Sequence, residues 1–166
     1  MTTPISSLIR HCATALCLLF TTSGAWAVQA SAQNANAERM QQAFTQWQQG
    51  SGTVFDLLAP DAVWTVAGSS PVSGVYHTKT DLMEQAVRPI TARLATPIAP
   101  TVRSIIAEDD VVVVLWSGAA TALDRKPYNN TYLWHLTFEG GIITRVTAFL
   151  DTYVLNDLMV RVKPGQ

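Results

Sequence analysis

The chain has little charge, and this scarcity excludes two classes of partner. Only 14% of its 166 residues are charged, and 11 Lys and Arg stand against 12 Asp and Glu, for a net charge of −1. A balanced charge of this kind provides no electrostatic footprint for nucleic acid and no polybasic patch for a membrane surface. The expected partner is therefore neither a nucleic acid nor a membrane.

The N-terminus has the pattern of a secretory signal peptide. Arg10 and His11 precede an apolar run over residues 12–20, and small-residue A-x-A patterns end at residues 27 and 32. Signal peptides have this order of basic region, short apolar region and cleavage site, and the run is shorter than the ~20 residues of a membrane-spanning helix. We therefore predict a signal peptide over residues 1–27, with cleavage after residue 32 as the alternative, and a periplasmic or secreted protein.

Cysteine is scarce, and both copies would leave with the signal peptide. Without Cys12 and Cys17 the mature chain has no thiol, no disulfide and no cysteine-based metal site. The remaining histidines, His77 and His135, do not have His-x-His or His-Glu-x-x-His spacing, so no metal is expected. A glycine-rich phosphate loop and a Gly-x-Ser-x-Gly elbow are also missing. No cofactor is expected.

What the chain does have is a group of helical patterns followed by long strands. Residues 28–36 are polar or small and lack periodicity, which predicts a disordered linker before one domain over residues 37–163. Apolar spacing and helix-ending Gly or Pro predict helices over residues 40–50, 54–58 and 80–90. Runs of β-branched and aromatic residues predict strands over residues 61–66, 98–107, 111–122, 128–138 and 142–150, before a short helix over residues 153–160. Early helices and late antiparallel strands indicate an α+β domain.

Four stretches resemble the SnoaL-like branch of the nuclear transport factor 2-like superfamily. They are residues 58–64 (LAPDAVW), 68–76, 128–130 (YNN) and 141–151, in the order and spacing of that family. The resemblance covers nearly the whole mature chain. It implies a cone in which a curved antiparallel sheet packs against three N-terminal helices, with a short C-terminal helix, around an apolar pocket. Ketosteroid isomerases, polyketide cyclases, limonene-epoxide hydrolases and non-catalytic binding modules share this fold.

The catalytic residues of those relatives have few counterparts in this chain. The general-base Asp of the ketosteroid isomerases would fall near residues 63–66, which hold no carboxylate, and Phe44 and Trp134 occupy the places of their oxyanion-hole residues. The Arg-x-Asp pair of the epoxide hydrolases is replaced by residues 115–117 (LWS). The Asp at the end of the last strand is matched by Asp151, and the resemblance implies an acid–base role for it.

Asp151 has two interpretations. Alternation along the last strand puts it on one face with Arg145, Thr147 and Phe149. If that face lines the pocket, burial would raise the pKa of Asp151, as a general acid or base at neutral pH requires. The alternative is that Asp151 is the N-cap of the helix that begins near Tyr153.

Aromatic and amide side chains are the candidates for ligand binding. Aromatic walls suit planar or polycyclic molecules, and a few polar groups fix a ligand in an apolar cleft. Packing of the core is the alternative role for each aromatic residue. The candidate binding residues are Trp47, Trp64, Tyr76, Asn130, Tyr132, Trp134 and Phe149.

Two functions follow from these observations. The first is an exported protein that binds a small apolar or aromatic molecule and acts as a cofactor-free isomerase, cyclase or hydrolase, with Asp151 as its acid–base residue. The second is a non-catalytic ligand-binding or dimerisation module of the same fold. By strand parity Leu133, His135 and Thr137 belong to the outer sheet face, which would serve a homodimer.

Overall fold

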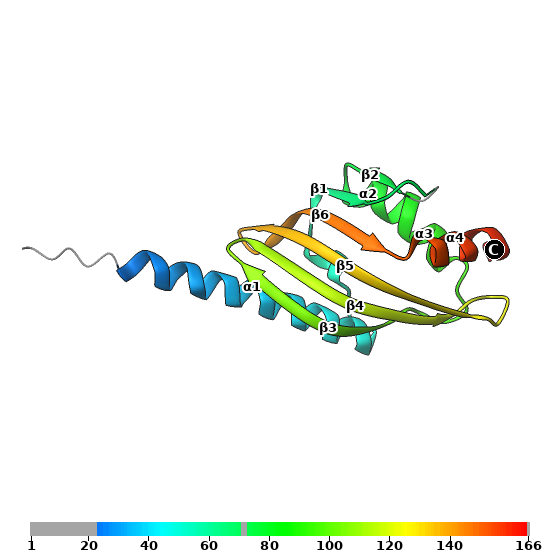
Figure 1. The fold of residues 1–166 in the computed structure, drawn as a ribbon, viewed down its shortest axis with the longest axis horizontal. Helices are drawn as coiled ribbons and strands as arrows, with labels where there is room; N and C mark the ends of the chain where they lie inside the picture. The colour runs from blue at the N-terminus through cyan, green and yellow to red at the C-terminus, as the bar shows by residue number, and fades with distance from the viewer. Residues whose placement is uncertain (1–22, 71–72, 166) are drawn as a thin grey trace, which may run out of the picture.

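A six-stranded sheet forms the body of this computed structural model, which describes residues 23–70 and 73–165 (Figure 1). The strand order is β2-β1-β6-β5-β4-β3, and the two outer strands do not pair, so the sheet stays open. Neighbouring strands are antiparallel except β1 and β6, which are parallel. The strands are β1 (Leu58–Val66), β2 (Gly74–Tyr76), β3 (Ala99–Glu108), β4 (Val111–Thr121), β5 (Pro127–Glu139) and β6 (Ile142–Leu150).

The burial pattern of β5 identifies the inner face of the sheet. Its even-numbered residues from 128 to 138 are all buried, and their odd-numbered neighbours are exposed or half-buried. Successive strand residues point to opposite faces, so the even-numbered side chains form the inner face. The same parity holds in β4, where residues 112, 114, 116 and 118 are buried. Gly140 and Gly141 join β5 to β6 with φ of 59° and 83°, the positive values that a tight hairpin turn requires.

Helices cover the concave side and close one end of the cone. The long helix α1 (Ser23–Gln49) packs against β3 and β4, and its N-terminal part extends past the sheet (Figure 1). The 3₁₀ helix η1 (Val54–Leu57) leads into β1. Between β2 and β3 lie α2 (Lys79–Leu82), the π-helical η2 (Met83–Val87) and α3 (Arg88–Thr91), and α4 (Thr152–Arg161) follows β6.

The π-helical turn has a local cause in Pro89. A proline has no N–H to donate, and its ring clashes with the carbonyl four residues earlier, which here belongs to Gln85. The turn widens instead, and the N–H of Arg88 donates to the carbonyl of Met83, five residues back. The helix therefore bends at Pro89 and continues to Thr91 rather than ending.

Buried side chains form two adjoining clusters. The larger one joins Met40 and Phe44 of α1 to the inner face of the sheet. The smaller one lies beneath α4 and contains Tyr128, Leu155 and Leu158. Apolar burial of this kind, at roughly 25 cal/mol per Å² removed from water, is the main stabilising contribution to the fold.

The predicted α+β class and curved sheet are confirmed. The sheet was expected to be antiparallel, whereas β1 and β6 are parallel, and β2 was not among the predicted strands. Details of the helices also differ. Residues 28–36, predicted as a disordered linker, belong to α1. The first turn of α2 is capped by the Thr78 hydroxyl, which accepts from the N–H of Asp81 at 2.9 Å. Leu58, predicted as helical, is the first residue of β1.

Candidate ligand-binding cavity

A cavity of about 480 Å³ lies between the inner face of the sheet and the helices that cover it. This volume is typical of small-molecule sites, which range from roughly 300 to 1,000 Å³. Its wall is built from α1, β1, β4, β5 and β6 on one side and from residues 82–91 and α4 on the other. The lining residues are Trp47, Thr53, Phe55, Trp64, Val66, Tyr76, Leu82, Met83, Gln85, Ala86, Val87, Pro89, Ile90, Thr91, Pro97, Ile98, Trp116, Tyr132, Trp134, Ala148, Leu150, Leu155 and Met159.

Aromatic rings in mutual contact form one side of this wall. Trp116 stacks on Tyr132 with ring centroids 4.0 Å apart and planes 10° from parallel. Trp134 packs edge-to-face with Trp116 and with Trp64, with ring centroids 4.8 Å and 5.0 Å apart. Edge-to-face and stacked pairs each contribute about 0.5–1.5 kcal/mol beyond their buried area. The cluster therefore makes a rigid aromatic surface.

The polar groups of the wall are few and uncharged. Among the lining residues that the structure describes there is no Asp, Glu, Lys, Arg or His. Burial raises the pKa of the Tyr132 phenol far above its ordinary range, and burial also raises that of Tyr76, so both stay protonated at neutral pH. An isolated charge is costly to bury without a partner. The cavity is therefore suited to uncharged molecules.

A buried network of polar side chains lies behind the wall at Tyr132. The hydroxyls of Tyr128 and Tyr132 are 3.1 Å apart. Asn130 bonds the backbone of Asp151 twice, donating from Nδ2 to its carbonyl at 3.0 Å and accepting at Oδ1 from its N–H at 3.0 Å. These two bonds fix the end of β6 against β5, so Asn130 has a clear structural role.

Asp151 lies outside the cavity. Its side chain is exposed, and Oδ1 accepts hydrogen bonds from the N–H groups of Tyr153 at 3.0 Å and Val154 at 3.2 Å. It is the N-cap of α4 and does not line the cavity. The expectation that its carboxylate would be desolvated in the pocket is therefore wrong, and the alternative interpretation as a helix cap describes its position.

Phe149 is also on the other side of the sheet. Val146 and Ala148 are buried, Leu150 is half-buried, and Ala148 and Leu150 line the cavity, whereas the Phe149 side chain is 51% exposed. The inner face of β6 is thus the face opposite to the one expected. The physical reason is that the face holding Arg145 carries polar side chains and leaves the core to the more apolar one.

Most of the remaining predicted binding residues line the cavity, and one is buried behind its wall. Trp47, Trp64, Tyr76, Tyr132 and Trp134 line the cavity, whereas Asn130 is buried behind it. His77 and His135 are exposed and do not line the cavity, and His135 belongs to the outer sheet face, as strand parity predicts.

Several lining residues were missed by sequence reasoning. Trp116 shares the inward parity of β4, which is a usable signal, and its buried indole N–H has no hydrogen-bond partner among residues 23–70 and 73–165. Phe55 and the helical residues Met83, Ile90 and Met159 had no such signal, because only the folded arrangement brings them to the cavity.

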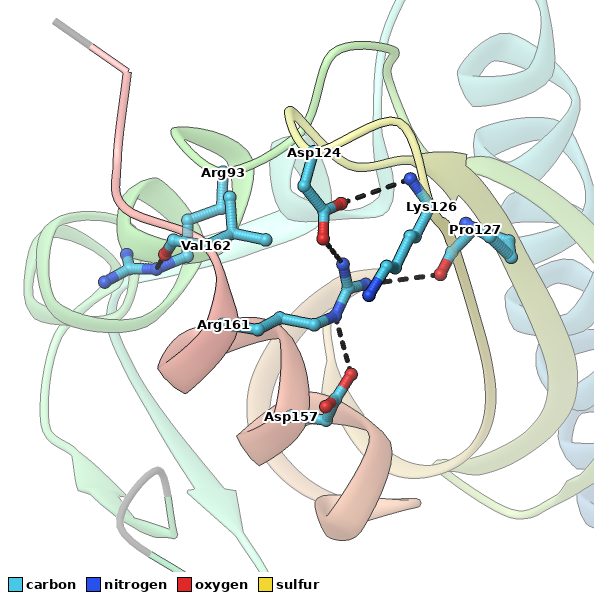
Figure 2. Close-up of polar contacts among 7 residues, drawn as sticks. All are labelled: Arg93, Asp124, Lys126, Pro127, Asp157, Arg161 and Val162. Atoms are coloured by element: carbon cyan, nitrogen blue, oxygen red, sulfur yellow. Dashed lines mark hydrogen bonds and ion pairs between the residues drawn. The ribbon is translucent and has the colours of Figure 1, made fainter.

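Two arginines hold the helices that close the cavity. Arg161 of α4 pairs with Asp124 and Asp157 and donates to the carbonyl of Pro127 at 3.3 Å (Figure 2). Arg93, which follows α3, donates to the carbonyl of Val162 at 2.8 Å (Figure 2). α3 and α4 are therefore tied to each other and to the β4–β5 turn, which gives the apolar cavity a fixed cover.

Residues 37–146 match the family model described as SnoaL-like domain. The chain belongs to this family. No curated protein matches it significantly in sequence. The match covers α1 from Ala37 through most of β6 and thus includes most of the cavity wall.

Solved structures share the fold of this SnoaL-like chain at low sequence identity. A nuclear transport factor 2-like protein of unknown function from Burkholderia pseudomallei K96243 is 19% identical, with a TM-score of 0.63 over 75% of this chain and 97% of its own. TerC, co-crystallised with polyporic acid, is 18% identical, with a TM-score of 0.60; the match covers 76% of this chain and 98% of TerC. A protein named as a candidate SnoaL-like polyketide cyclase, from Jannaschia sp. CCS1, is 11% identical, with a TM-score of 0.60 over 78% and 94%.

Two further features of the described residues concern metal binding and membrane-spanning helices. Within residues 23–70 and 73–165, no group of three or more His, Cys, Asp or Glu side chains is arranged to hold a metal ion. None of the helices in this same part of the chain is long and apolar enough to cross a membrane.

Proposed function

We propose that this SnoaL-like protein binds an uncharged, largely apolar molecule with one or more rings. The observation that carries this proposal is the cavity of about 480 Å³, whose described wall is rich in aromatic side chains and has no carboxylate, imidazole, ammonium or guanidinium group. An apolar ligand gains by leaving water for such a wall, and flat rings gain further by stacking on the indoles. A charged ligand would lose its hydration without finding a counter-charge.

The structural relatives support binding of a small molecule. TerC has been crystallised with polyporic acid, and the Jannaschia protein is named for polyketide cyclisation. Both share the fold rather than close sequence similarity with this chain. They support small-molecule binding, and the chemistry of the cavity wall narrows the ligand class for this chain.

Binding is favoured over proton-transfer catalysis by the position of Asp151. A general acid or base must come within hydrogen-bond reach of the atom that gains or loses the proton. The Asp151 carboxylate instead bonds the N–H groups of Tyr153 and Val154 at the start of α4. The non-catalytic binding module is therefore the function that the geometry supports best.

Tryptophan fluorescence offers a direct test, because four of the five tryptophans line the cavity. We expect the tricyclic hydrocarbon fluorene to change this emission saturably, and fluorene-9-carboxylate, which carries a charge, to bind more weakly. Saturable binding of neither probe would overturn the proposal. Equal binding of both would overturn the preference for uncharged ligands.

A pair of substitutions on β6 locates the bound molecule. Ala148 is 2% exposed and lines the cavity, so Ala148→Leu should occupy ligand space and weaken fluorene binding. Thr147→Leu introduces the same side chain at the neighbouring half-buried position, which does not line the cavity, and should leave binding unchanged. Equal effects of the two substitutions would show that fluorene binds elsewhere.

We also propose that the protein is exported and that it forms a homodimer. Export is supported by the basic residues, the short apolar run and the A-x-A patterns of the first 32 residues. The dimer is supported by the exposed apolar side chains of Leu133 and Phe149, which are paired in register on the outer sheet face. Fractionation of the producing cells tests export. Light scattering of wild type and Phe149→Lys tests the dimer, which the charge should weaken.

A further inference from the structure

Asn130, Tyr128 and Tyr132 form a chain of hydrogen bonds whose direction can be assigned. Asn130 Oδ1 lies 2.7 Å from the N–H of Thr131 and 3.0 Å from the N–H of Asp151. Both neighbours can only donate, so this atom must be the amide oxygen. The Nδ2 group therefore faces the carbonyl of Asp151 and the hydroxyl of Tyr128, to which it donates at 3.0 Å and 3.4 Å.

The amide fixes the direction of the next bond. Because Asn130 presents a hydrogen to Tyr128 Oη, that oxygen accepts and its own hydrogen must point elsewhere. The distance of 3.1 Å between the two phenol oxygens allows either of them to donate. If Tyr132 donated, the hydrogen of Tyr128 would be buried without an acceptor among the described residues, at a side chain only 1% exposed. A buried unpaired donor is costly, so Tyr128 donates to Tyr132.

The chain therefore ends with a hydrogen on Tyr132 that has no acceptor among the described residues. Of the three side chains only Tyr132 lines the cavity. Its ring is held in place by Trp116, on which it stacks at 4.0 Å. Burial raises the pKa of both phenols, so both hydrogens are retained at neutral pH. A chain of donors pointing in one direction also polarises its last member.

We propose that Tyr132 donates this hydrogen bond to a carbonyl oxygen of the molecule bound in the cavity. The inference rests on the proposed function and narrows it: the ligand is an apolar ring compound with an acceptor oxygen at the edge that meets Tyr132. Tyr128 and Asn130 are positioning residues, since they act through Tyr132. The proposal also gives the Asn130 amide a second role besides tying β6 to β5.

The test compares 9-fluorenone with fluorene, two tricyclic molecules of similar shape of which only the first has a carbonyl group. In the wild type we expect fluorenone to bind more tightly, and its carbonyl stretch to lie at lower wavenumber than in cyclohexane. Tyr132→Phe should weaken fluorenone binding by roughly 2- to 10-fold, the effect of one hydrogen bond, and leave fluorene binding unchanged. Tyr153→Phe, at a side chain 83% exposed, is the matched control and should change neither.

The outcomes separate this inference from the proposed function. If neither probe binds saturably, the cavity does not take ring compounds and both proposals fail. If both probes bind and Tyr132→Phe weakens them equally, the binding function stands and the assigned hydrogen bond is wrong. The infrared measurement needs no variant: a carbonyl stretch equal to that in cyclohexane overturns the inference even if Tyr132→Phe does not fold.

Discussion

Tyr132 and Trp116 are directly paired across β5 and β4, and their rings stack with centroids 4.0 Å apart. The next inward position on β4 after Trp116 is Gly118, which is buried. A methyl group at Gly118 would lie 2.8 Å from Cγ2 of Ile98, 3.1 Å from Trp116 and 3.2 Å from Tyr132. The stack therefore depends on the absence of a side chain at this position.

Gly118→Ala should disturb both the stack and the cavity wall. Contacts this short force neighbouring side chains away, and overpacking of this kind typically costs about 1–3 kcal/mol. We expect a lower free energy of unfolding in urea and weaker fluorene binding. Gly74→Ala is the control, because its methyl group would meet nothing within 4 Å, and its effect should stay within about 0.5 kcal/mol. Equal stability of the two variants would contradict the close packing at Gly118.

Replacement of Asp151 separates a cap from an acid–base residue. Asp151→Ala removes both hydrogen bonds to the start of α4 and should lower the free energy of unfolding by about 1 kcal/mol, whereas Asp151→Asn retains a preferred cap and should cost much less. Both variants should bind fluorene like the wild type. An activity that is found in the wild type and lost in Asp151→Asn, with stability retained, would restore the acid–base hypothesis.

Five of the six strands and the β5 half of the site could be predicted from sequence because they depend on local alternation, whereas the three-residue β2 was not predicted. Parity within one strand placed Tyr132 and Trp134 together on the inner face and His135 on the outer one. Parity alone does not say which face of a strand is inner, and the wrong choice for β6 put Phe149 and Asp151 in the cavity. The better signal was composition, since Val146, Ala148 and Leu150 are more apolar than Arg145 and Thr147.

The other half of the cavity could not be predicted, because it depends on tertiary packing. Residues 82–91 reach the wall through a π-helical turn and a bend at Pro89, whose geometry no apolar period encodes. α4 lies over the cavity because Leu155 and Leu158 are buried in one cluster with Tyr128, and because Arg161 and Arg93 tie its end to distant loops (Figure 2). Similarly, the helical state of residues 28–36 is not visible in a segment without apolar periodicity.

The ion pair of Arg161 with Asp124 should make stability depend on pH in the acid range. The hydrogen bond from Arg161 is the first cause that lowers the pKa of Asp124 below its ordinary value of 3.8. The Asp124 carboxylate therefore binds a proton less readily in the folded state than in the unfolded state. The stability that the ion pair contributes is complete well above pH 3.8 and is lost as the pH falls through the lower pKa of the folded state. The melting temperature of Asp124→Asn should therefore lie below that of the wild type at neutral pH.

The difference in melting temperature between the wild type and Asp124→Asn gives the readout. This difference should decrease steadily as the pH is lowered below 3.8. Added salt should also decrease it, because the ion pair is near the surface. A difference that stays constant down to pH 2 would mean that the asparagine acts through packing and that the ion pair contributes no stability.

Truncation of α1 tests how much of this helix the fold uses. The first buried side chain described in α1 is Asn36, followed by the fully buried Met40. The predicted cleavage sites lie before Val28 and Gln33, so either mature chain keeps both residues. We expect chains that begin at Val28 or Gln33 to match each other in free energy of unfolding. A chain that begins at Gln41 loses the burial of Met40 and should be less stable by about 2–5 kcal/mol, the usual cost of emptying such a site. If the chains that begin at Gln33 and Gln41 lost the same stability relative to the chain that begins at Val28, the fold would require residues before Gln33. That result would exclude the later cleavage site.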